Sequence, residues 1–133
     1  MMRPRMQVGA LTIGAARPRE LAQFYAEMLG WPVAALEGPR PGKPPADGWA
    51  QIRPPEGESG PTLNFETDEN YRRPVWPSEP GEQTASQHLD IGVDDLEAAV
   101  AWALEKGATL AEVQPQDGVR VMIDPDGHPF CLC

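Results

Sequence analysis

The sequence is poor in basic residues and contains no long apolar run. Lys and Arg total 11 of 133 residues against 20 Asp and Glu, which gives a formal net charge of -9. No basic stripe is present to neutralise phosphates, so a nucleic acid is not an expected partner. No segment approaches transmembrane length or resembles the apolar region of a signal peptide, so a membrane is not an expected partner either. We therefore expect an acidic, cytoplasmic protein.

Cysteine and histidine are equally scarce, with two of each. Cys131 and Cys133 are two residues apart, where strand alternation puts them on one face but makes a mutual disulfide awkward, so reduced thiols are expected. His128 follows the turn Pro125-Asp126-Gly127 and is expected to face solvent. His88 is then the one histidine left for a site, and an iron centre of two histidines and a carboxylate is not favoured.

The motifs of common nucleotide and hydrolase chemistries are also missing. The segment Gly38 to Lys43 superficially suggests a phosphate loop, but its spacing is short, Pro44 replaces the Ser or Thr, and no helix follows. A Gly-x-Ser-x-Gly elbow and a dinucleotide fingerprint are both absent. These reaction classes have no support in the sequence.

The most informative positive feature is an internal repeat. A strand from Ala10 to Gly14 precedes a helical stretch from Arg17 to Gly30, and a second strand from His88 to Gly92 precedes a helical stretch from Asp94 to Gly107. Both helices end on a glycine at the equivalent position, which is difficult to explain by composition alone. The repeat therefore predicts two βαβββ modules in an α+β fold. We expect one domain over residues 1–133, with module 1 at 5–68, a connection at 69–86 and module 2 at 87–133.

Local patterns place the remaining elements. Asp94 and Glu97 form a capping-box pattern at the start of the second helix, and Tyr25 and Trp102 occupy equivalent helical positions where packing is expected. A proline-rich stretch from Glu37 to Gly48 predicts an irregular loop. The other expected strands, listed together, are Gln7 to Ile13, Trp49 to Arg53, Thr62 to Glu66, Val119 to Ile123 and Phe130 to Cys133.

These motifs resemble the vicinal oxygen chelate superfamily, which includes glyoxalase I, bleomycin-resistance proteins and extradiol dioxygenases. The resemblance lies in Leu11 to Ile13 with Glu20 to Trp31, in His88 to Ile91 with Val93 to Ala99, and in Asp124 to Leu132. It implies two βαβββ modules whose curved mixed sheet encloses a cup, and it implies a homodimer. The fold alone does not choose between catalysis and binding.

The resemblance also implies where metal ligands would stand. His88 matches the first-strand ligand of the second module, and Cys131 stands where a glutamate is common. The last-strand position of the first module falls on Asn64 or Glu66, depending on the alignment. Ala10 occupies the remaining position and has no ligand atom, so the resemblance implies at most a reduced metal site of His88 and Cys131 with Glu66 or Asn64.

Each of these residues also has a plainer interpretation. His88 is equally consistent with a strand histidine bonded to a carbonyl, Cys131 with a small buried hydrophobe, and Glu66 with a solvated carboxylate. Asp90 shares the face of His88 by strand alternation and is a second pocket candidate. Trp49 lies outside the periodic core pattern, which favours stacking on a ligand.

Two hypotheses from different classes follow. The first is a metal-independent protein that binds a small organic molecule, cationic or aromatic, in a pocket containing Asn64, Glu66, His88, Asp90, Cys131 and Trp49. This hypothesis needs no cofactor. The second is a metal-dependent lyase, isomerase or dioxygenase with a divalent metal at the reduced site, where a pocket carboxylate moves a proton. Of the two, the sequence favours the binding protein, and it leaves open whether the chain is an enzyme.

Overall fold

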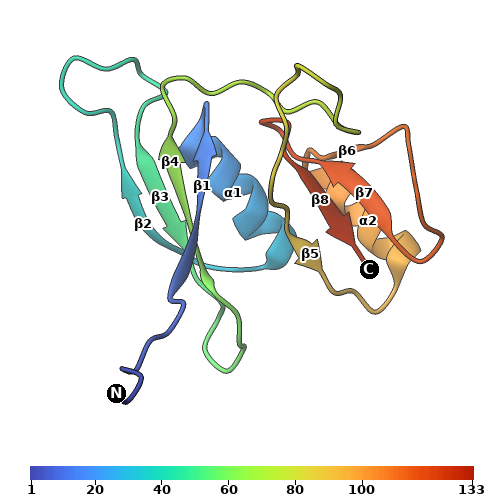
Figure 1. Cartoon of the computed structure of the whole chain (residues 1–133), viewed down its shortest axis with the longest axis horizontal. Coiled ribbons are helices and arrows are strands. Elements are labelled where there is room, and N and C mark those ends of the chain that lie inside the picture. The colour runs from blue at the N-terminus through green and yellow to red at the C-terminus, as the bar shows by residue number, and fades with distance from the viewer. The chain divides into compact units, whose positions relative to one another are not determined.

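Each half of the chain folds as a strand, a helix and three further strands (Figure 1). The computed structural model describes all 133 residues, which divide into two compact units, Met1–Asp68 and Glu69–Cys133. The first unit contains β1 (Ala10–Ala15), α1 (Pro18–Leu29), β2 (Val33–Glu37), β3 (Trp49–Ile52) and β4 (Thr62–Thr67). The second contains β5 (Asp90–Ile91), α2 (Leu96–Lys106), β6 (Thr109–Leu110), β7 (Arg120–Ile123) and β8 (Pro129–Leu132).

The two sheets have the same topology. The strand order is β1-β4-β3-β2 in the first unit and β5-β8-β7-β6 in the second. In each, the first and last strands of the module pair in parallel, while the other neighbours are antiparallel. The expected α+β class and the pair of βαβββ modules are confirmed. Neither four-stranded sheet closes into a barrel.

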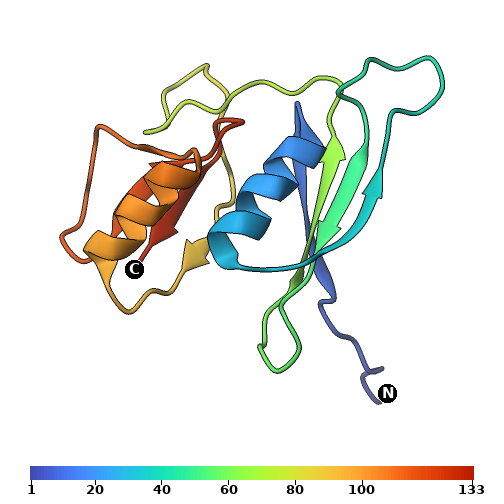
Figure 2. The same ribbon diagram turned by 180° about the vertical axis from the view of Figure 1, so that it is seen from behind.

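In the first unit, α1 covers one face of the sheet (Figure 2). Its apolar stripe is buried against alternate residues of β3 and β4, and the Tyr25 and Phe65 rings stack with their centroids 5.7 Å apart. The fully buried residues of this core include Leu21, Tyr25, Ile52 and Phe65. Because strand side chains alternate, burial of Leu63 and Phe65 under α1 puts Asn64 and Glu66 on the opposite face.

Both helices end as the sequence predicts, on Gly30 and Gly107. Gly30 adopts a left-handed conformation, with φ 71°, and donates its backbone N–H to the carbonyl of Ala26. The start of α2 differs from the expectation, because Asp95 is the N-cap and accepts a bond from the backbone N–H of Ala98 at 3.1 Å. The capping-box prediction for Asp94 was wrong by one residue, since the helix begins at Leu96 and Glu97 falls in its second position.

The second unit has a smaller core under its helix. Ala103 is the one residue of α2 that is fully buried, and it faces a sheet core that includes Met122, Phe130 and Leu132. Trp102 was expected to pack like Tyr25, and this prediction was wrong. Its side chain is 44% exposed and lies under the Lys106 ammonium, which is 4.4 Å from the ring centroid. The short strands of this sheet offer α2 less surface than α1 covers.

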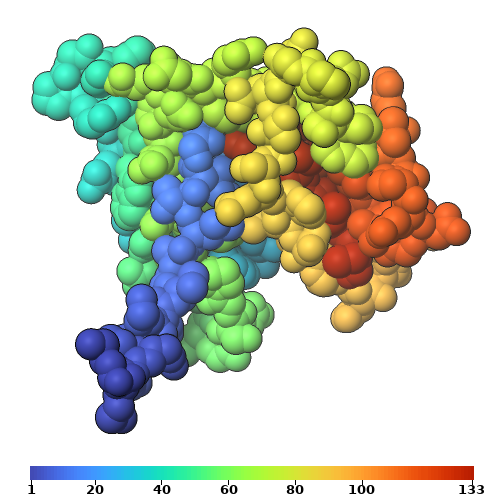
Figure 3. Space-filling model, in the orientation of Figure 1, coloured from blue at the N-terminus to red at the C-terminus, as the bar shows by residue number.

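The expected strands and loops need small corrections at their ends. The first strand begins at Ala10 rather than Gln7, and the proline-rich loop is preceded by β2, which was not predicted. Residues 1–9 form no strand and are exposed, and they extend from the first unit as the dark blue segment in Figure 3. The connection at 69–86 belongs to the second unit. Neither helix has the length and apolarity needed to cross a bilayer.

Candidate functional site

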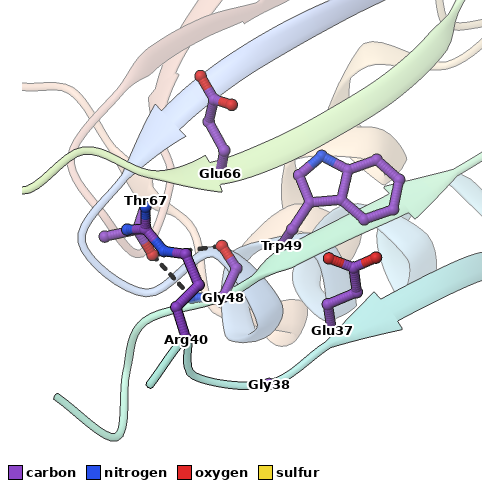
Figure 4. Close-up of a pocket in the computed structure, with 7 residues that line it drawn as sticks. All are labelled: Glu37, Gly38, Arg40, Gly48, Trp49, Glu66 and Thr67. Atoms are coloured by element: carbon purple, nitrogen blue, oxygen red, sulfur yellow. Dashed lines mark hydrogen bonds between the residues drawn. The ribbon is translucent and has the colours of Figure 1, made fainter. Parts of the chain in front are cut away.

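The face of the first sheet opposite α1 carries a row of three side chains from adjacent strands. Glu37 of β2 is in register with Trp49 of β3, which is in register with Glu66 of β4. The Trp49 indole therefore stands between two carboxylate-bearing side chains (Figure 4). Strand register fixes this order, because each of the three residues occupies the same face at the same level of the sheet.

This acidic row lines a pocket of about 320 Å³. The pocket is completed by residues at the ends of the proline-rich loop and of β4. Its lining residues are Glu37, Gly38, Arg40, Gly48, Trp49, Glu66 and Thr67. An aromatic face and convergent polar groups in one concave site are the usual ingredients of a small-molecule pocket.

The one cationic side chain of the pocket is already paired. Arg40 donates to the buried Asp47 carboxylate from its backbone N–H at 2.9 Å, from Nε at 3.0 Å and from Nη2 at 2.6 Å. These hydrogen bonds from Arg40 hold the pKa of the Asp47 carboxyl well below its usual range. Because Asp47 neutralises Arg40, the remaining formal charge of the lining comes from Glu37 and Glu66.

The proline-rich loop that forms one wall is held at its C-terminal end. Arg19 of α1 donates from Nη2 to the carbonyls of Pro45 and Asp47. At the sheet, the backbone N–H of Gly48 donates to Oγ1 of Thr67 at 2.8 Å, and the backbone N–H of Thr67 donates to the Gly48 carbonyl at 3.2 Å. The pocket is therefore built on a loop that side-chain hydrogen bonds fix in place.

Asn64 lies on the same face, two residues before Glu66 along β4, and is not part of the pocket lining. It accepts a hydrogen bond from Nε2 of Gln51 at 2.8 Å and donates to Oγ1 of Thr12 at 3.4 Å. The sequence left Asn64 and Glu66 as alternatives. In the structure both project from the face opposite α1, and Glu66 is the one beside Trp49.

The second unit brings together three of the sequence-predicted residues, namely His88, Asp90 and Cys131. Asp90 and Cys131 are register partners on β5 and β8, and Nε2 of His88 lies 3.2 Å from Oδ1 of Asp90. One ligand atom from each of the three lies within 4.8 Å of the others. His88 and Asp90 are exposed, whereas Cys131 is half-buried. Glu66, the third ligand in the expected set, belongs to the first unit.

Burial raises the pKa of the Cys131 thiol, and the neighbouring Asp90 carboxylate raises it further through its charge and a hydrogen bond. The thiol is therefore poorly ionised in the metal-free protein. A bound cation would reverse this effect, because metal coordination deprotonates a thiol. Cys131 and Cys133 are both free rather than disulfide-bonded.

His128 does not face solvent, so that prediction was wrong. Its Nδ1 lies 2.8 Å from Oδ2 of Asp124, a carboxylate with no exposed surface, and its side chain is 19% exposed. Tyr71 from the connection contacts the same turn, with its hydroxyl 2.8 Å from the carbonyl of Asp126 and 3.3 Å from Nε2 of His128. The sequence contains a signal for this arrangement in the Asp-Pro-Asp-Gly-His turn, whose first Asp can accept from later backbone N–H groups.

Two βαβββ modules, each with one helix and one four-stranded sheet, define the class of protein to which this chain belongs. Residues 10–133 match the model of the glyoxalase-like domain family, so the chain is a member of that family and of the vicinal oxygen chelate superfamily. No curated protein sequence matches the chain.

Solved structures support the same assignment of the fold. A glyoxalase family protein from Enterococcus faecalis has 24% sequence identity and a TM-score of 0.65, over 95% of each chain. TnmS3, an antibiotic binding protein from Streptomyces sp. CB03234, has 19% identity and a TM-score of 0.60, covering 98% of this chain and 97% of that one. A glyoxalase/bleomycin resistance protein/dioxygenase family enzyme from Burkholderia phytofirmans PsJN has 15% identity and a TM-score of 0.62, covering 96% and 97%. These similarities include both a binding protein and an enzyme.

Proposed function

We propose that this protein binds a small cationic aromatic molecule without the help of a metal. The observation that carries the proposal is the row in which Trp49 stands between Glu37 and Glu66, in a pocket whose one cation is already paired with Asp47. TnmS3, one of the proteins with a similar structure, is an antibiotic binding protein, which is in keeping with this role.

The chemistry of the row favours a positive charge beside an aromatic ring. A cation over the face of a Trp ring gains about 0.5–1 kcal/mol at an exposed site and more when it is desolvated. Two carboxylates at the same level add attraction for the same charge, and they disfavour an anion. The Trp49 indole is the aromatic part of the lining, between the acidic side chains of β2 and β4. An aromatic ring of the ligand can stack on it.

Three soluble aromatic probes of different charge test this proposal. Phenyltrimethylammonium, benzyl alcohol and benzenesulfonate carry one positive charge, no charge and one negative charge. Binding is followed by two-dimensional NMR through the indole N–H signal of Trp49, which Trp49→Phe identifies among the four tryptophans. We expect the cation to bind at least several-fold more tightly than the neutral probe, the anion not to bind, and the preference to weaken with added salt.

Variants locate the binding in the pocket. Glu66→Gln and Glu37→Gln should each weaken the binding of phenyltrimethylammonium about two- to fivefold, which is the effect expected of an exposed charge. Glu58→Gln is the matched control, because Glu58 is exposed in the turn between β3 and β4 and is not part of the lining. Equal affinity for the cation and for benzyl alcohol would contradict the proposal, as would an equal effect of Glu58→Gln.

The cluster of His88, Asp90 and Cys131 favours a second candidate function, a metal-dependent lyase, isomerase or dioxygenase. Nitrogen, oxygen and sulfur donors are those that zinc accepts, and three protein ligands leave an open position, where a bound metal would act as a Lewis acid. A tetrahedral site with bonds of about 2.0–2.3 Å separates its ligand atoms by roughly 3.3–3.8 Å. The observed limit of 4.8 Å is close enough for exposed side chains to adjust.

Zinc titration by calorimetry separates the two candidates without an activity assay. Under the metal hypothesis the wild-type protein binds about one zinc ion per chain, and His88→Ala and Cys131→Ser abolish binding. Asp90→Asn and Glu66→Gln, tested in parallel, show which carboxylate belongs to the ligand set. Absence of zinc binding in the wild type would remove this candidate.

We further propose that residues 1–133 act as one domain in the cytoplasm, as a homodimer. Free cysteines suit a reducing compartment. Several large apolar side chains of the second unit are about half exposed, namely Trp102, Leu104, Leu110 and Val113, and a second chain that covered some of them would remove apolar surface from water. Light scattering coupled to size-exclusion chromatography should give twice the chain mass of 14.5 kDa. A monomer at all concentrations would contradict the dimer.

A further inference from the structure

A second row of polar side chains crosses three strands of the first unit, next to the acidic row. Thr12 of β1, Asn64 of β4 and Gln51 of β3 are register partners on the face opposite α1. Arg53 donates from Nε to Oε1 of Gln51 at 2.9 Å and extends the row. We call these four residues the donor row.

The direction of the hydrogen bonds in this row is fixed by Arg53. A guanidinium can only donate, so the oxygen of the Gln51 amide must face it, and the Gln51 nitrogen must face Asn64. Nε2 of Gln51 accordingly donates to Oδ1 of Asn64 at 2.8 Å. Nδ2 of Asn64 is then turned toward Oγ1 of Thr12 at 3.4 Å. One cation at the end of the row therefore orients both amides.

This orientation decides what the row offers to a ligand. Each amide uses one N–H inside the row and keeps a second N–H outside it, while Thr12 accepts within the row and keeps its hydroxyl hydrogen. Gln51 and Asn64 are half-buried and Thr12 is exposed, so these hydrogens are not sealed in a core. The row thus presents donors, which match an acceptor oxygen such as a carbonyl or carboxylate oxygen.

The two rows are separated by one step of the strand pleat. Asn64 and Glu66 are two residues apart on β4, and Gln51 and Trp49 are two apart on β3. At about 3.3 Å per residue, the rows lie roughly 7 Å apart. One small molecule can therefore reach both.

We propose that the donor row is a specificity subsite for a carbonyl-type oxygen on the same ligand whose cation occupies the Trp49 pocket. The inference rests on the proposed binding function and narrows its ligand class. The ligand is a cationic aromatic compound with an acceptor oxygen about 7 Å from its positive charge, a separation that follows from the strand rise. Thr12, Asn64 and Gln51 contact the oxygen, and Arg53 is a positioning residue that acts through Gln51.

A matched pair of probes tests the subsite. Phenyltrimethylammonium carries the cation alone, and 4-(trimethylammonio)benzamide adds a carbonyl oxygen across the ring. We expect the amide probe to bind about fivefold more tightly, which corresponds to about 1 kcal/mol. The side-chain NH₂ signals of Asn64 and Gln51 should shift with the amide probe and stay in place with phenyltrimethylammonium.

The ratio of the two dissociation constants is the quantity to compare among variants. Thr12→Val and Asn64→Leu should bring the ratio close to one. Thr62→Val is the matched control for Thr12→Val, because Thr62 lies on the same face of β4 but one step further from the pocket, and it should keep the ratio. Arg53→Met should lower the ratio and Arg53→Lys should restore it, because an ammonium also only donates. Amide spectra of each variant establish that it is folded.

The two proposals fail in different ways. The donor row is not a subsite if phenyltrimethylammonium binds at Trp49 but the amide probe binds no more tightly. The same holds if the amide probe keeps its higher affinity in Thr12→Val and Asn64→Leu. In both cases the proposed cation pocket is not contradicted. If neither probe binds, both proposals are wrong. Glu66→Gln provides an internal check, since it should weaken both probes by a similar factor and leave their ratio unchanged.

Discussion

The carboxylate of Asp124 accepts hydrogen bonds from two nitrogens of His128, four residues later in the same turn. The backbone N–H donates to Oδ1 at 3.0 Å, and ring Nδ1 lies 2.8 Å from Oδ2. The backbone N–H of Asp126 donates to Oδ1 as well, at 3.0 Å. Because Asp124 has no exposed side-chain surface, this turn depends on a buried carboxyl group that is hydrogen-bonded to the residues after it.

Removal of that carboxyl group should destabilise the protein strongly. We expect Asp124→Ala to lower the free energy of unfolding by about 3 kcal/mol, because several N–H groups lose their acceptor inside the structure. Tyr71→Phe removes only the hydroxyl that donates to the Asp126 carbonyl and should cost about 1 kcal/mol. Urea denaturation measures both. Asp117→Ala, at an exposed position, is the control and should stay within about 0.5 kcal/mol. An Asp124→Ala protein as stable as this control would contradict a structural role for the turn.

The pair of Arg40 and Asp47 should make stability depend on acid pH. The folded-state pKa of Asp47 is lowered, so its contribution to stability is fully present above about pH 5 and is lost as the pH falls below about 4. We expect Asp47→Asn to be less stable than the wild type near neutral pH, with a difference that shrinks at low pH. Thermal unfolding at a series of pH values measures this. A difference independent of pH would show that the charge of Asp47 is not involved.

Substitution by alanine should affect stability differently at two glycines of the proline-rich loop. A Cβ at Gly48 would overlap the carbonyl oxygen of Glu37, which belongs to the backbone and cannot easily move. A Cβ at Gly38 would meet nothing within 4 Å. Gly48→Ala should therefore cost about 1–3 kcal/mol of stability, the usual effect of overpacking, whereas Gly38→Ala should be nearly neutral. Chemical denaturation compares the two, and equal effects would mean that the close approach of β2 and β3 at Gly48 is not required.

The thiol of Cys131 should react slowly because its pKa is raised by burial and by the charge of Asp90. In the Cys133→Ser background, alkylation by iodoacetamide at pH 8 should be slow. Asp90→Asn in the same background should accelerate it several-fold, since loss of the carboxylate charge increases the thiolate fraction. Glu112→Gln, an exposed position in the same unit, serves as the charge-matched control. No acceleration in Asp90→Asn would contradict the proximity of the two side chains.

The fold could be predicted because its signals are local. Gly30 and Gly107 end their helices by backbone conformations that a short stretch of sequence specifies. The strands β2 and β6 were missed for an equally physical reason. Ala34 and Ala35 give β2 little strand preference, and β6 is two exposed residues long, so neither shows the alternation of a half-buried strand.

The candidate site could be predicted only where it follows from the alternation of side chains within a single strand. Alternation was enough to expect His88 and Asp90 on one face. The pairing of Arg40 with Asp47 was not accessible, because it needs the path of a loop between two strands. The exposure expected for His128 was wrong since a turn usually faces water, whereas here Tyr71 from the connection contacts its ring. Such contacts arise from segments more than fifty residues apart in the chain.

The equivalence of the two modules bears on how each can change. In the sequence repeat, Ala10 and Thr12 of β1 correspond to His88, which precedes β5, and to Asp90 of β5, and in both modules the neighbouring strand is the last one of the unit. An organic cation needs a wide pocket with an aromatic wall, whereas a metal ion needs a few converging donor atoms. A duplicated scaffold can meet both demands in one polypeptide, because equivalent positions of the two copies can carry different side chains, as Ala10 and His88 do. The repeat therefore gives one chain two sets of positions at which side-chain chemistry can diverge.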